Sequence, residues 1–435
     1  MQTRLIPVYQ EQPEGKEAEA ILRNCVHCGF CNATCPTYQA LGNELDGPRG
    51  RIYLIKQMLE GKPVSERTRV HLDRCLSCRA CETTCPSGVD YHRLLDIGRG
   101  YLDQQLTRPL PNRLKRWLLA RALGSPVFFR VLLGMGRMFR PVLPRRLREK
   151  VPPRLRTMAP GGQGIPGAAP VADPSSARFP GESQRKVLMV TGCVQDALAP
   201  DINIATKRVL GAFGFDVLET PAAECCGAMS FHLGETERAH DLLVRNVESW
   251  WRLHQEHDFD AIVVNASGCG LFVKDYPQLL QAHPDLLEKA NSLSALTKDP
   301  VEVLEREDLS RLRSGSSIRP QAIAFHPPCT LQHGLKLSGR VEALLSSLGI
   351  EVLSFSNAHL CCGSAGTYSI LQADLSRQLR SEKLAAIEAV KPDLVLTANI
   401  GCQSHLAAAS GVPIKHWLEF VSEMLTDPRS ERSTL

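Results

Sequence analysis

The fold of the first part of this chain is decided by two runs of sequence, CVHCGFCNATCP at residues 25–36 and CLSCRACETTCP at residues 75–86. Both runs have the spacing Cys-x-x-Cys-x-x-Cys-x-x-x-Cys-Pro. In this spacing three thiolates of one short loop bind three corners of a [4Fe–4S] cube. The fourth cysteine, followed by a proline that turns the chain, binds the cube of the other run. The two runs therefore predict two cubes with crossed ligands.

The crossed arrangement assigns eight of the sixteen cysteines to two clusters. The first cluster takes Cys25, Cys28, Cys31 and Cys85, and the second takes Cys35, Cys75, Cys78 and Cys81. A single Cys-x-x-Cys would also be compatible with zinc or a redox pair. Zinc is disfavoured because zinc sites use paired couples of cysteines rather than triplets with a distant fourth. Disulfides are disfavoured because no N-terminal stretch has the pattern of a secretory signal, which indicates a reducing cytosol.

Length and charge indicate several domains, one of them basic. The 435 residues have room for two or three domains, and their composition is that of a globular protein. Residues 99–156 carry fifteen Arg or Lys and two acidic residues, a net charge of +13, so the rest of the chain nets −8 within a total of +5. This asymmetry predicts contact with an anionic surface.

The basic segment is also amphipathic. Trp117, Phe128, Phe129 and Phe139 stand among aliphatic residues at helical spacing, and arginines interrupt them. No apolar run approaches the roughly 20 residues that a membrane-spanning helix needs. The pattern therefore predicts helices that lie in a membrane interface, or that pack on the protein's own domains or on a partner subunit. Nucleic acid is not expected as a partner, because no nucleic-acid-binding module accompanies the basic residues.

The second part of the chain is an internal repeat. Cys193, Cys225-Cys226-Gly227 and Cys269 recur as Cys329, Cys361-Cys362-Gly363 and Cys402, at an offset of 136 residues for the first three cysteines and 133 for the last. Short apolar runs are typical of buried strands and occur at residues 187–190, 262–264, 322–325 and 394–396. Helical patterns lie between them at 204–213, 235–253, 341–348 and 375–390. Alternating strands and helices predict parallel sheets whose C-terminal edges, where such sheets bind ligands, carry the cysteines.

The repeated cysteines are a second set of candidate metal or redox residues. They are Cys193, Cys225, Cys226 and Cys269 in the first copy, and Cys329, Cys361, Cys362 and Cys402 in the second. Adjacent cysteines can both ligate one metal site, and the glycine after them allows a positive φ or a close backbone approach. The alternative is that they pack as small hydrophobic residues. Recurrence at one offset favours a metal centre, most simply a further iron–sulfur cluster, in at least one copy. Four thiolates complete a cluster, so surface or hydrogen-bonded roles are expected for His333, His359, His405 and His416.

These patterns predict a multidomain protein. We expect a mainly α-helical, two-cluster ferredoxin-type domain at residues 1–104, followed by a pseudo-twofold pair of α/β Cys-Cys-Gly repeats with parallel sheets at 185–317 and 318–425. The basic helical segment occupies residues 105–156, a flexible linker rich in Pro and Gly occupies 157–184, and a tail occupies 426–435.

Several stretches together resemble the iron–sulfur subunits of flavin-dependent 2-hydroxyacid and glycerol-phosphate dehydrogenases, above all those of glycolate oxidase (glycolate dehydrogenase). They are the first cysteine run, Asp46-Gly-Pro-Arg-Gly-Arg-Ile-Tyr-Leu-Ile-Lys, Ser267-Gly-Cys-Gly, Cys361-Cys-Gly-Ser-Ala-Gly-Thr-Tyr and Thr397-Ala-Asn-Ile-Gly-Cys. The resemblance covers residues 20 to 425, without the linker and the tails. It implies an oxidoreductase complex in which a separate FAD subunit oxidises glycolate to glyoxylate and this chain passes electrons towards a membrane quinone.

The chain itself has no FAD fingerprint, because no Gly-x-Gly-x-x-Gly follows a strand and opens a helix. Substrate chemistry therefore belongs to the partner, and no catalytic residue is assigned here. We expect a peripheral position on the cytoplasmic face of the inner membrane, or a cytoplasmic one. The alternatives are the iron–sulfur subunit of a lactate or glycerol-3-phosphate dehydrogenase, and a catalytic subunit like that of heterodisulfide reductases, whose Cys-Cys-Gly repeats hold clusters that cleave a disulfide. In a third alternative the repeats form a docking scaffold without metal.

Overall fold

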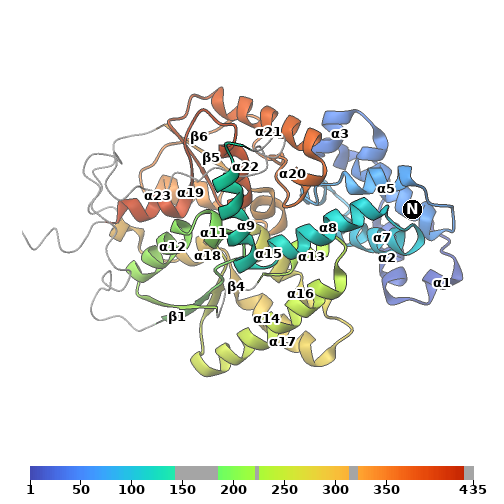
Figure 1. Ribbon diagram of the computed structural model, residues 1–435, viewed down its shortest axis with the longest axis horizontal. Helices are drawn as coiled ribbons and strands as arrows, with labels where there is room; N and C mark the ends of the chain where they lie inside the picture. The colour runs from blue at the N-terminus through green and yellow to red at the C-terminus, as the bar shows by residue number, and fades with distance from the viewer. Residues whose placement is uncertain (143–184, 221–224, 313–321, 426–435) are drawn as a thin grey trace, which may run out of the picture.

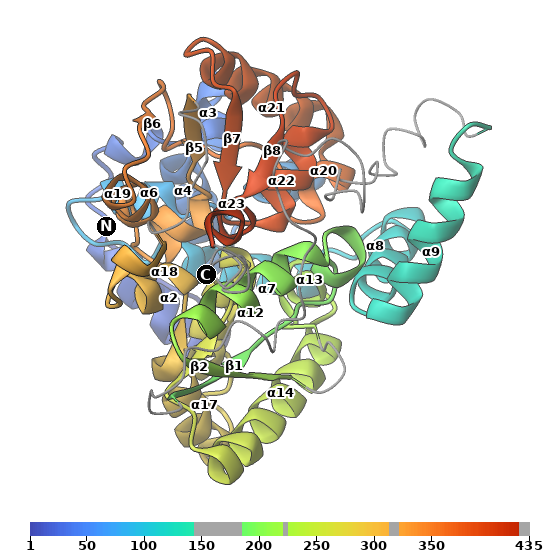
Figure 2. The same cartoon turned by 90° about the vertical axis from the view of Figure 1, so that its left-hand side faces the viewer.

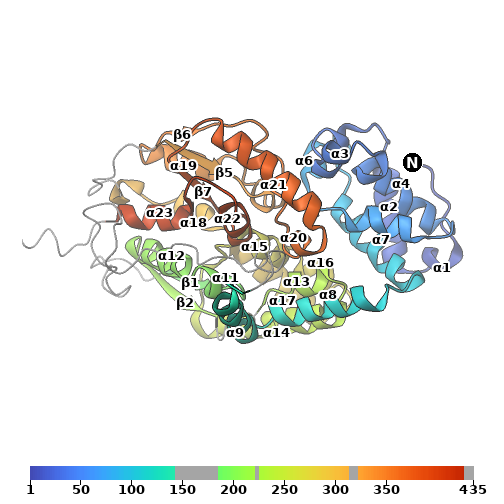
Figure 3. The same cartoon turned by 45° about the horizontal axis from the view of Figure 1, so that its top comes forward.

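The computed structural model describes residues 1–142, 185–220, 225–312 and 322–425 (Figure 1). The predicted linker at 157–184, the tail at 426–435 and the end of the basic segment lie outside the described residues. An N-terminal helical domain contains both cysteine runs and lies at one end of the molecule (Figure 3). Two α/β halves lie beside it, the first half at residues 185–312 and the second half at residues 322–425.

The N-terminal domain is a set of short helices around one apolar core. Between the cysteine runs, α4 (Pro48–Leu59) begins at a proline, whose missing N–H costs nothing in the first turn. Ile52, Ile55 and Met58 follow at helical spacing and are buried, and α4 packs on α7 (Tyr91–Gln105). Burial of each such side chain contributes about 1.5–3 kcal/mol. The other helices are α1 (Pro7–Gln10), α2 (Pro13–Asn24), α3 (Pro36–Leu41), α5 (Glu66–Asp73) and α6 (Ala80–Thr84).

Each half has a parallel four-stranded sheet among its described residues. The first sheet has the order β2-β1-β3-β4 and the second has the order β6-β5-β7-β8. Their strands are β1 (Arg185–Met189), β2 (Phe215–Glu219), β3 (Ala261–Val263), β4 (Thr297–Lys298), β5 (Ile323–His326), β6 (Val352–Leu353), β7 (Leu394–Thr397) and β8 (Ile414–His416). The identical strand order confirms the predicted fold class, although the numerical domain limits stay predictions.

Strand order explains why the cysteines converge. The chain leaves β1 towards β2 and then returns to β3 on the other side of β1, so the order reverses between β1 and β3. Ligands of open α/β sheets bind outside the C-terminal strand ends at such a reversal. Cys193 and Cys269 follow β1 and β3, and Cys225 and Cys226 follow β2. The second half repeats this arrangement around β5, β6 and β7.

Helices connect the strands close to where the sequence predicts them. In the first half they are α11 (Gln195–Leu198), α12 (Asp201–Ala212), α13 (Ala228–His232), α14 (Thr236–His257), α15 (Ser267–Lys274), α16 (Tyr276–Leu279), α17 (Pro284–Leu296) and α18 (Pro300–Leu304). In the second half they are α19 (Arg340–Ser347), α20 (Tyr368–Leu371), α21 (Ala373–Glu388), α22 (Ile400–Ala407) and α23 (Trp417–Met424). The helix expected at 235–253 continues to His257. Its last turn is polar, so the apolar pattern in the sequence stops before the helix does. The helix ends where Asp258 adopts a left-handed φ of 47°.

The two halves share one core with reciprocal contacts. The helix after the last strand of each half packs on a helix after the first strand of the other, α18 on α19 and α23 on α12. Val209 and Leu210 of α12 belong to the same buried cluster as Trp417 and Val421 of α23. This exchange agrees with the predicted pseudo-twofold pair.

The described part of the basic segment forms α8 (Leu110–Leu123) and α9 (Pro126–Phe139), an arm at the margin of the molecule (Figure 2). Arg116 binds Asp73 across 3.2 Å and ties α8 to the N-terminal domain. Phe129 and Leu133 of α9 are buried against the first half near Ala199. Within the described residues no single helix is long and apolar enough to cross a membrane; only α8 and α9 together, bent by 103° at their junction, meet the length and composition criteria for a span.

Candidate metal centres

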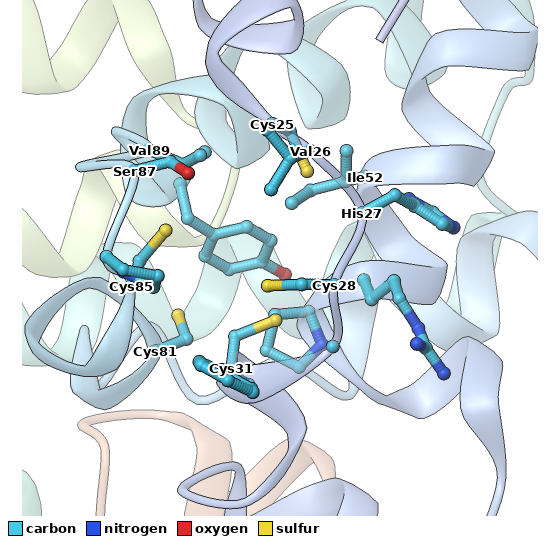
Figure 4. Close-up of a pocket in the computed structure, with 16 residues that line it drawn as sticks. Cys25, Val26, His27, Cys28, Cys31, Ile52, Cys81, Cys85, Ser87 and Val89 are labelled. Atoms are coloured by element: carbon cyan, nitrogen blue, oxygen red, sulfur yellow. The ribbon is translucent and has the colours of Figure 1, made fainter.

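The first cysteine run and the end of the second run face one hollow. Cys25, Cys28, Cys31 and Cys85 line it, together with Cys81 (Figure 4). Cys28 is exposed, whereas Cys25 is buried. Burial raises the pKa of the Cys31 thiol to about 11, so thiolates are favoured here only beside a cation, and a metal supplies that charge. Four sulfur donors around one hollow fit an iron–sulfur cluster.

Both loops share an unusual backbone that the spacing alone does not predict. His27 and Gly29 have φ angles of 61° and 87°, and Ser77 and Arg79, at the same offsets in the second run, have 52° and 58°. Alternation of right- and left-handed residues turns successive N–H groups towards one side, which is the anion-binding concavity found at many iron–sulfur sites. Three of these four residues are not glycine, so the loops hold a conformation that costs about 1–3 kcal/mol per residue.

The fourth cysteine of the first run lies with the second run. Cys35 and Cys75 both lie near the buried Arg51; burial lowers the pKa of Arg51, but the negative charges of Cys75, Cys35 and Asp46 raise it overall. Cys75 accepts hydrogen bonds from the N–H of Ser77 (3.5 Å) and the hydroxyl of Tyr91 (3.7 Å). Burial raises the pKa of Cys78 and of Cys81 well above the usual value. Cys35 of the first run thus lies close to cysteines of the second run, and the crossed ligand sets stay a prediction.

The run Asp46-Gly-Pro-Arg-Gly-Arg lies beside Cys35 and Cys75 of this second site. Asp46 is fully buried and lies 2.9 Å from His71 Nδ1, 3.0 Å from Arg74 Nη1 and 3.7 Å from Arg51 Nη2. Gly50 is required, because a Cβ there would lie 2.1 Å from the Glu44 carbonyl oxygen. Sequence reasoning did not single out Asp46 and Arg51 as site residues, although their position between the two runs was a usable signal.

In the first half the four predicted cysteines meet. Cys225 lies beside Cys193 and Cys226, and Cys226 lies beside Cys269. The N–H of Gly227 donates to Cys225 Sγ across 3.5 Å, and a φ of 95° at Gly227 makes this turn possible. Cys269 also packs against the apolar cluster that contains Phe129 and Leu133 of α9, so the arm lies near this site.

The second half repeats the arrangement with different neighbours. Cys329 Sγ lies 3.8 Å from Cys361 Sγ, Cys361 contacts Cys362, and Cys362 contacts Cys402. The ammonium of Lys383 is buried beside them and donates to the carbonyl oxygen of Ala358 across 3.2 Å. Burial lowers the pKa of Lys383 to about 8, although the four cysteines oppose this shift. Lys383 was missed from the sequence, because a lysine on a helix is usually solvated.

The histidines of the second half differ in their surroundings. His333 bridges Thr83 Oγ1 (3.0 Å) and the His359 carbonyl oxygen (2.8 Å), and His416 Nε2 lies 3.1 Å from the Asn265 carbonyl oxygen. His405 Nε2 lies 3.4 Å from Ser376 Oγ. His326 differs, because its ring and the sulfurs of Cys362 and Cys402 lie within 4.8 Å of one another. Burial lowers the pKa of His326 well below its usual value.

The second cysteine run lies against both halves. Tyr368 Oη donates to the Arg74 carbonyl oxygen across 3.0 Å, and Leu76 and Cys78 pack in one cluster with Cys329 and Cys361. On the other side, Arg79 forms an ion pair with Asp275 of the first half. The second ferredoxin-type site therefore adjoins the cysteines of the second half directly.

Comparison with known proteins agrees with this architecture. Residues 21–89 match the family described as the 4Fe-4S dicluster domain, and residues 187–274 and 323–407 each match the family described as the Cysteine-rich domain. The chain is 47% identical to the "Glycolate oxidase iron-sulfur subunit" of Escherichia coli (strain K12), over 98% of this chain and 99% of that protein. It is 33% identical to the "Probable glycolate oxidase iron-sulfur subunit" of Bacillus subtilis (strain 168), over 90% of each chain. "Lactate utilization protein A" of Geobacillus thermodenitrificans (strain NG80-2) is 29% identical over 52% of this chain and 92% of that protein.

The fold and the cysteine sites thus define an iron–sulfur protein with a dicluster domain and two cysteine-rich repeats. The chain belongs to the family of glycolate oxidase iron–sulfur subunits. The predicted family and the predicted [4Fe–4S] cofactor class are confirmed.

Proposed function

We propose that this chain is the electron-transfer subunit of a glycolate dehydrogenase complex, in which an FAD subunit oxidises glycolate and this chain conducts the electrons towards a membrane quinone. The single observation that carries the proposal is the full-length similarity to a glycolate oxidase iron–sulfur subunit, joined with the packing of the second cysteine run against the cysteines of the second half. Bound clusters supply one-electron transfer. Every other task that the complex needs, including substrate chemistry, belongs to partners.

The ligands in this proposal are the crossed sets. Cys25, Cys28, Cys31 and Cys85 hold the first cluster, and Cys35, Cys75, Cys78 and Cys81 hold the second. The grouping of Cys85 with the first run around one hollow supports the first set. The joint electrostatic influence of Cys75 and Cys35 on Arg51 supports the second. At least one of the repeat sets, in the first or the second half, holds a further centre.

The order of the sites suggests a direction for electron flow. The first run is the exposed end, where Cys28 is open to solvent and the side chains of Val26 and Phe30 are 68% and 62% exposed. We assign this apolar surface to the FAD subunit, because an electron donor has to approach the first cluster closely. The second run follows, then the cysteines of the second half. The two halves meet near Cys269 and Cys329, where Ser267 Oγ and Thr330 Oγ1 lie 2.7 Å apart.

The arm is the proposed membrane contact. Val127, Phe128, Val131, Leu132, Met135, Met138 and Phe139 of α9 are between 46% and 71% exposed, while Phe129 and Leu133 of α9 belong to the buried cluster against which Cys269 packs. Exposed apolar patches of this kind mark protein or membrane contacts. Flanking arginines favour an anionic surface, at about 1 kcal/mol per basic residue near it. On this assignment the complex lies on the cytoplasmic face of the inner membrane, with the first-half cysteines nearest the bilayer.

A separate observation supports a second candidate substrate. The "Lactate utilization protein A" relatives match about half of this chain, so lactate is the second candidate for the partner's substrate. Purification of the chain with its associated subunits tests both candidates. Glycolate should reduce the flavin of the complex, and quinone reduction should disappear when Cys78→Ser removes the second cluster while substrate still reduces the flavin. Unchanged quinone reduction by a variant that has lost that cluster would contradict the proposal.

A further inference from the structure

The two repeats differ at two buried positions beside their cysteines. At the common offset of 136 residues, His326 corresponds to Val190 and Lys383 corresponds to Val247. All four side chains are at most 3% exposed. The first half thus surrounds its cysteines with apolar groups at these positions, whereas the second half places an imidazole and an ammonium there. Buried polar groups are costly unless they have partners, so this difference calls for a physical reason.

His326 lacks the partners that a buried histidine normally has. Neither of its ring nitrogens has a hydrogen-bond partner among the described residues, although the side chain is only 1% exposed. A buried ring nitrogen without a hydrogen-bond partner destabilises the folded chain. The equally buried His416 shows the usual solution, because Asn265 O lies at 3.1 Å from its Nε2 and Leu418 N donates to its Nδ1 across 3.3 Å. The ring of His326 instead faces Cys362 and Cys402, with the three donor atoms within 4.8 Å of one another.

We propose that His326 is a metal ligand, so that the second half holds a mixed thiolate–imidazole centre with Cys362 and Cys402, while the first half offers thiolates alone. We assign the fourth position to Cys361, the chain neighbour of Cys362. Cluster iron and zinc both accept thiolate and imidazole together. This inference rests on the proposed metal centre in at least one repeat, and it identifies which repeat holds it and with which donors.

The mixed donor set has a consequence for electron flow. An imidazole in place of a thiolate removes one negative charge, and the same exchange of histidine for cysteine raises the reduction potential of Rieske centres. The buried ammonium of Lys383 acts in the same direction, because positive charge stabilises the reduced form. A cluster in the second half would therefore accept electrons more readily than an all-thiolate one, and it adjoins the second cysteine run through Cys329 and Cys78.

The test uses the full chain, reconstituted anaerobically with iron and sulfide and labelled with ¹⁵N-histidine. The key variant is His326→Val, because the first half already accommodates valine at this position. His416→Gln is the matched control, and Cys362→Ser reports whether the second half holds metal at all. Pulsed electron paramagnetic resonance detects a histidine nitrogen bound to cluster iron, and X-ray absorption at the zinc edge detects one bound to zinc.

We expect a bound histidine nitrogen in the wild type and in His416→Gln, and none in His326→Val. The second-half metal of His326→Val should be lost to a chelator at least about tenfold faster than that of the wild type. If Cys362→Ser loses metal but the wild type shows no histidine nitrogen, His326 is not a ligand and the proposed function stands. If Cys362→Ser holds as much metal as the wild type, the second half has no centre, and both the inference and the proposed metal in this repeat are wrong.

Discussion

Tyr368 Oη donates a hydrogen bond to the carbonyl oxygen of Arg74 across 3.0 Å. Tyr368 opens α20, six residues after the Cys-Cys of the second half, and Arg74 directly precedes Cys75. The bond therefore fixes the spacing between two cysteine sites whose side chains pack in one cluster. Electron transfer between centres depends on such fixed contacts, so the interface between the N-terminal domain and the second half is part of the proposed function.

Tyr368→Phe tests this contact. The variant keeps the ring and removes one hydrogen bond, so we expect the free energy of unfolding to fall by about 0.5–1.5 kcal/mol, with unchanged iron content. Thermal denaturation of the metal-loaded chain measures it. Tyr53→Phe is the control, because the Tyr53 side chain is 43% exposed on α4. Equal midpoints for Tyr368→Phe and the wild type would show that the bond does not hold the interface.

Asp46→Asn tests the buried charges under the second cluster site. Asp46 faces Arg51, His71 and Arg74, and loss of its charge leaves Arg51 buried without its carboxylate. Removal of one partner from a buried ion pair lowers the free energy of unfolding by about 3–5 kcal/mol. Asp374→Asn, whose side chain is 97% exposed beside Arg377, should change the unfolding free energy by less than about 1 kcal/mol. Similar denaturant midpoints for the two variants would contradict the assignment.

Asp299 gives a prediction for pH. Burial raises the pKa of this carboxyl group, which caps α18 through the N–H of Val301, to about 7. Between the unfolded value of about 3.9 and 7, the folded chain therefore binds more protons than the unfolded chain, so the stability contributed by Asp299 is present at low pH and is lost as pH rises towards 7.

Asp299→Asn should remove this pH dependence, because an amide still accepts the capping hydrogen bond but carries no charge. The difference in unfolding free energy between variant and wild type should change by up to about 4 kcal/mol between pH 4 and 7, in favour of the variant at the higher pH. Measurements at pH 6, 7 and 8, while clusters remain bound, would detect about a third of this change, roughly 1.4 kcal/mol. A constant difference across this range would mean that Asp299 is charged in the folded state throughout.

The arm gives a prediction for membranes. Replacement of Phe128, Val131 and Met135 by serine should abolish flotation of the assembled complex with anionic vesicles and leave iron content unchanged, since all three side chains are at least 50% exposed. Val70→Ser, an exposed change in the N-terminal domain, should float like the wild type. If the triple variant still floats, or if the wild type does not float at low salt, the arm is not a membrane contact and its exposed face belongs to a partner subunit.

The sequence predicted the parts of this molecule that depend on spacing and periodicity. The two cysteine runs, the offset of 136 residues and the apolar runs before Cys193 and Cys329 were sufficient for the fold class and the convergence of each cysteine set. What it could not predict were contacts between distant segments. The pairing of Asp46 with His71, the packing of Cys78 on Cys361 and the burial of Lys383 arise from tertiary structure, which no local pattern encodes.

His326 illustrates the same limit. Its place just before Cys329 was visible in the sequence, but a histidine at the end of a strand is ordinarily a hydrogen-bonded core residue. Only the structure shows that both ring nitrogens lack partners among the described residues and that the ring faces two cysteines.

The most direct test of the central claim is the metal content and electron paramagnetic resonance of the reduced chain, purified without oxygen, as wild type, Cys35→Ser and Cys85→Ser. We expect two [4Fe–4S] signals in the wild type. Cys35→Ser should damage the cluster held by Cys75, Cys78 and Cys81, and Cys85→Ser should damage the one held by Cys25, Cys28 and Cys31. A wild-type chain that holds zinc and shows no cluster signal, or variants in which each serine damages the cluster of its own run, would contradict the central claim.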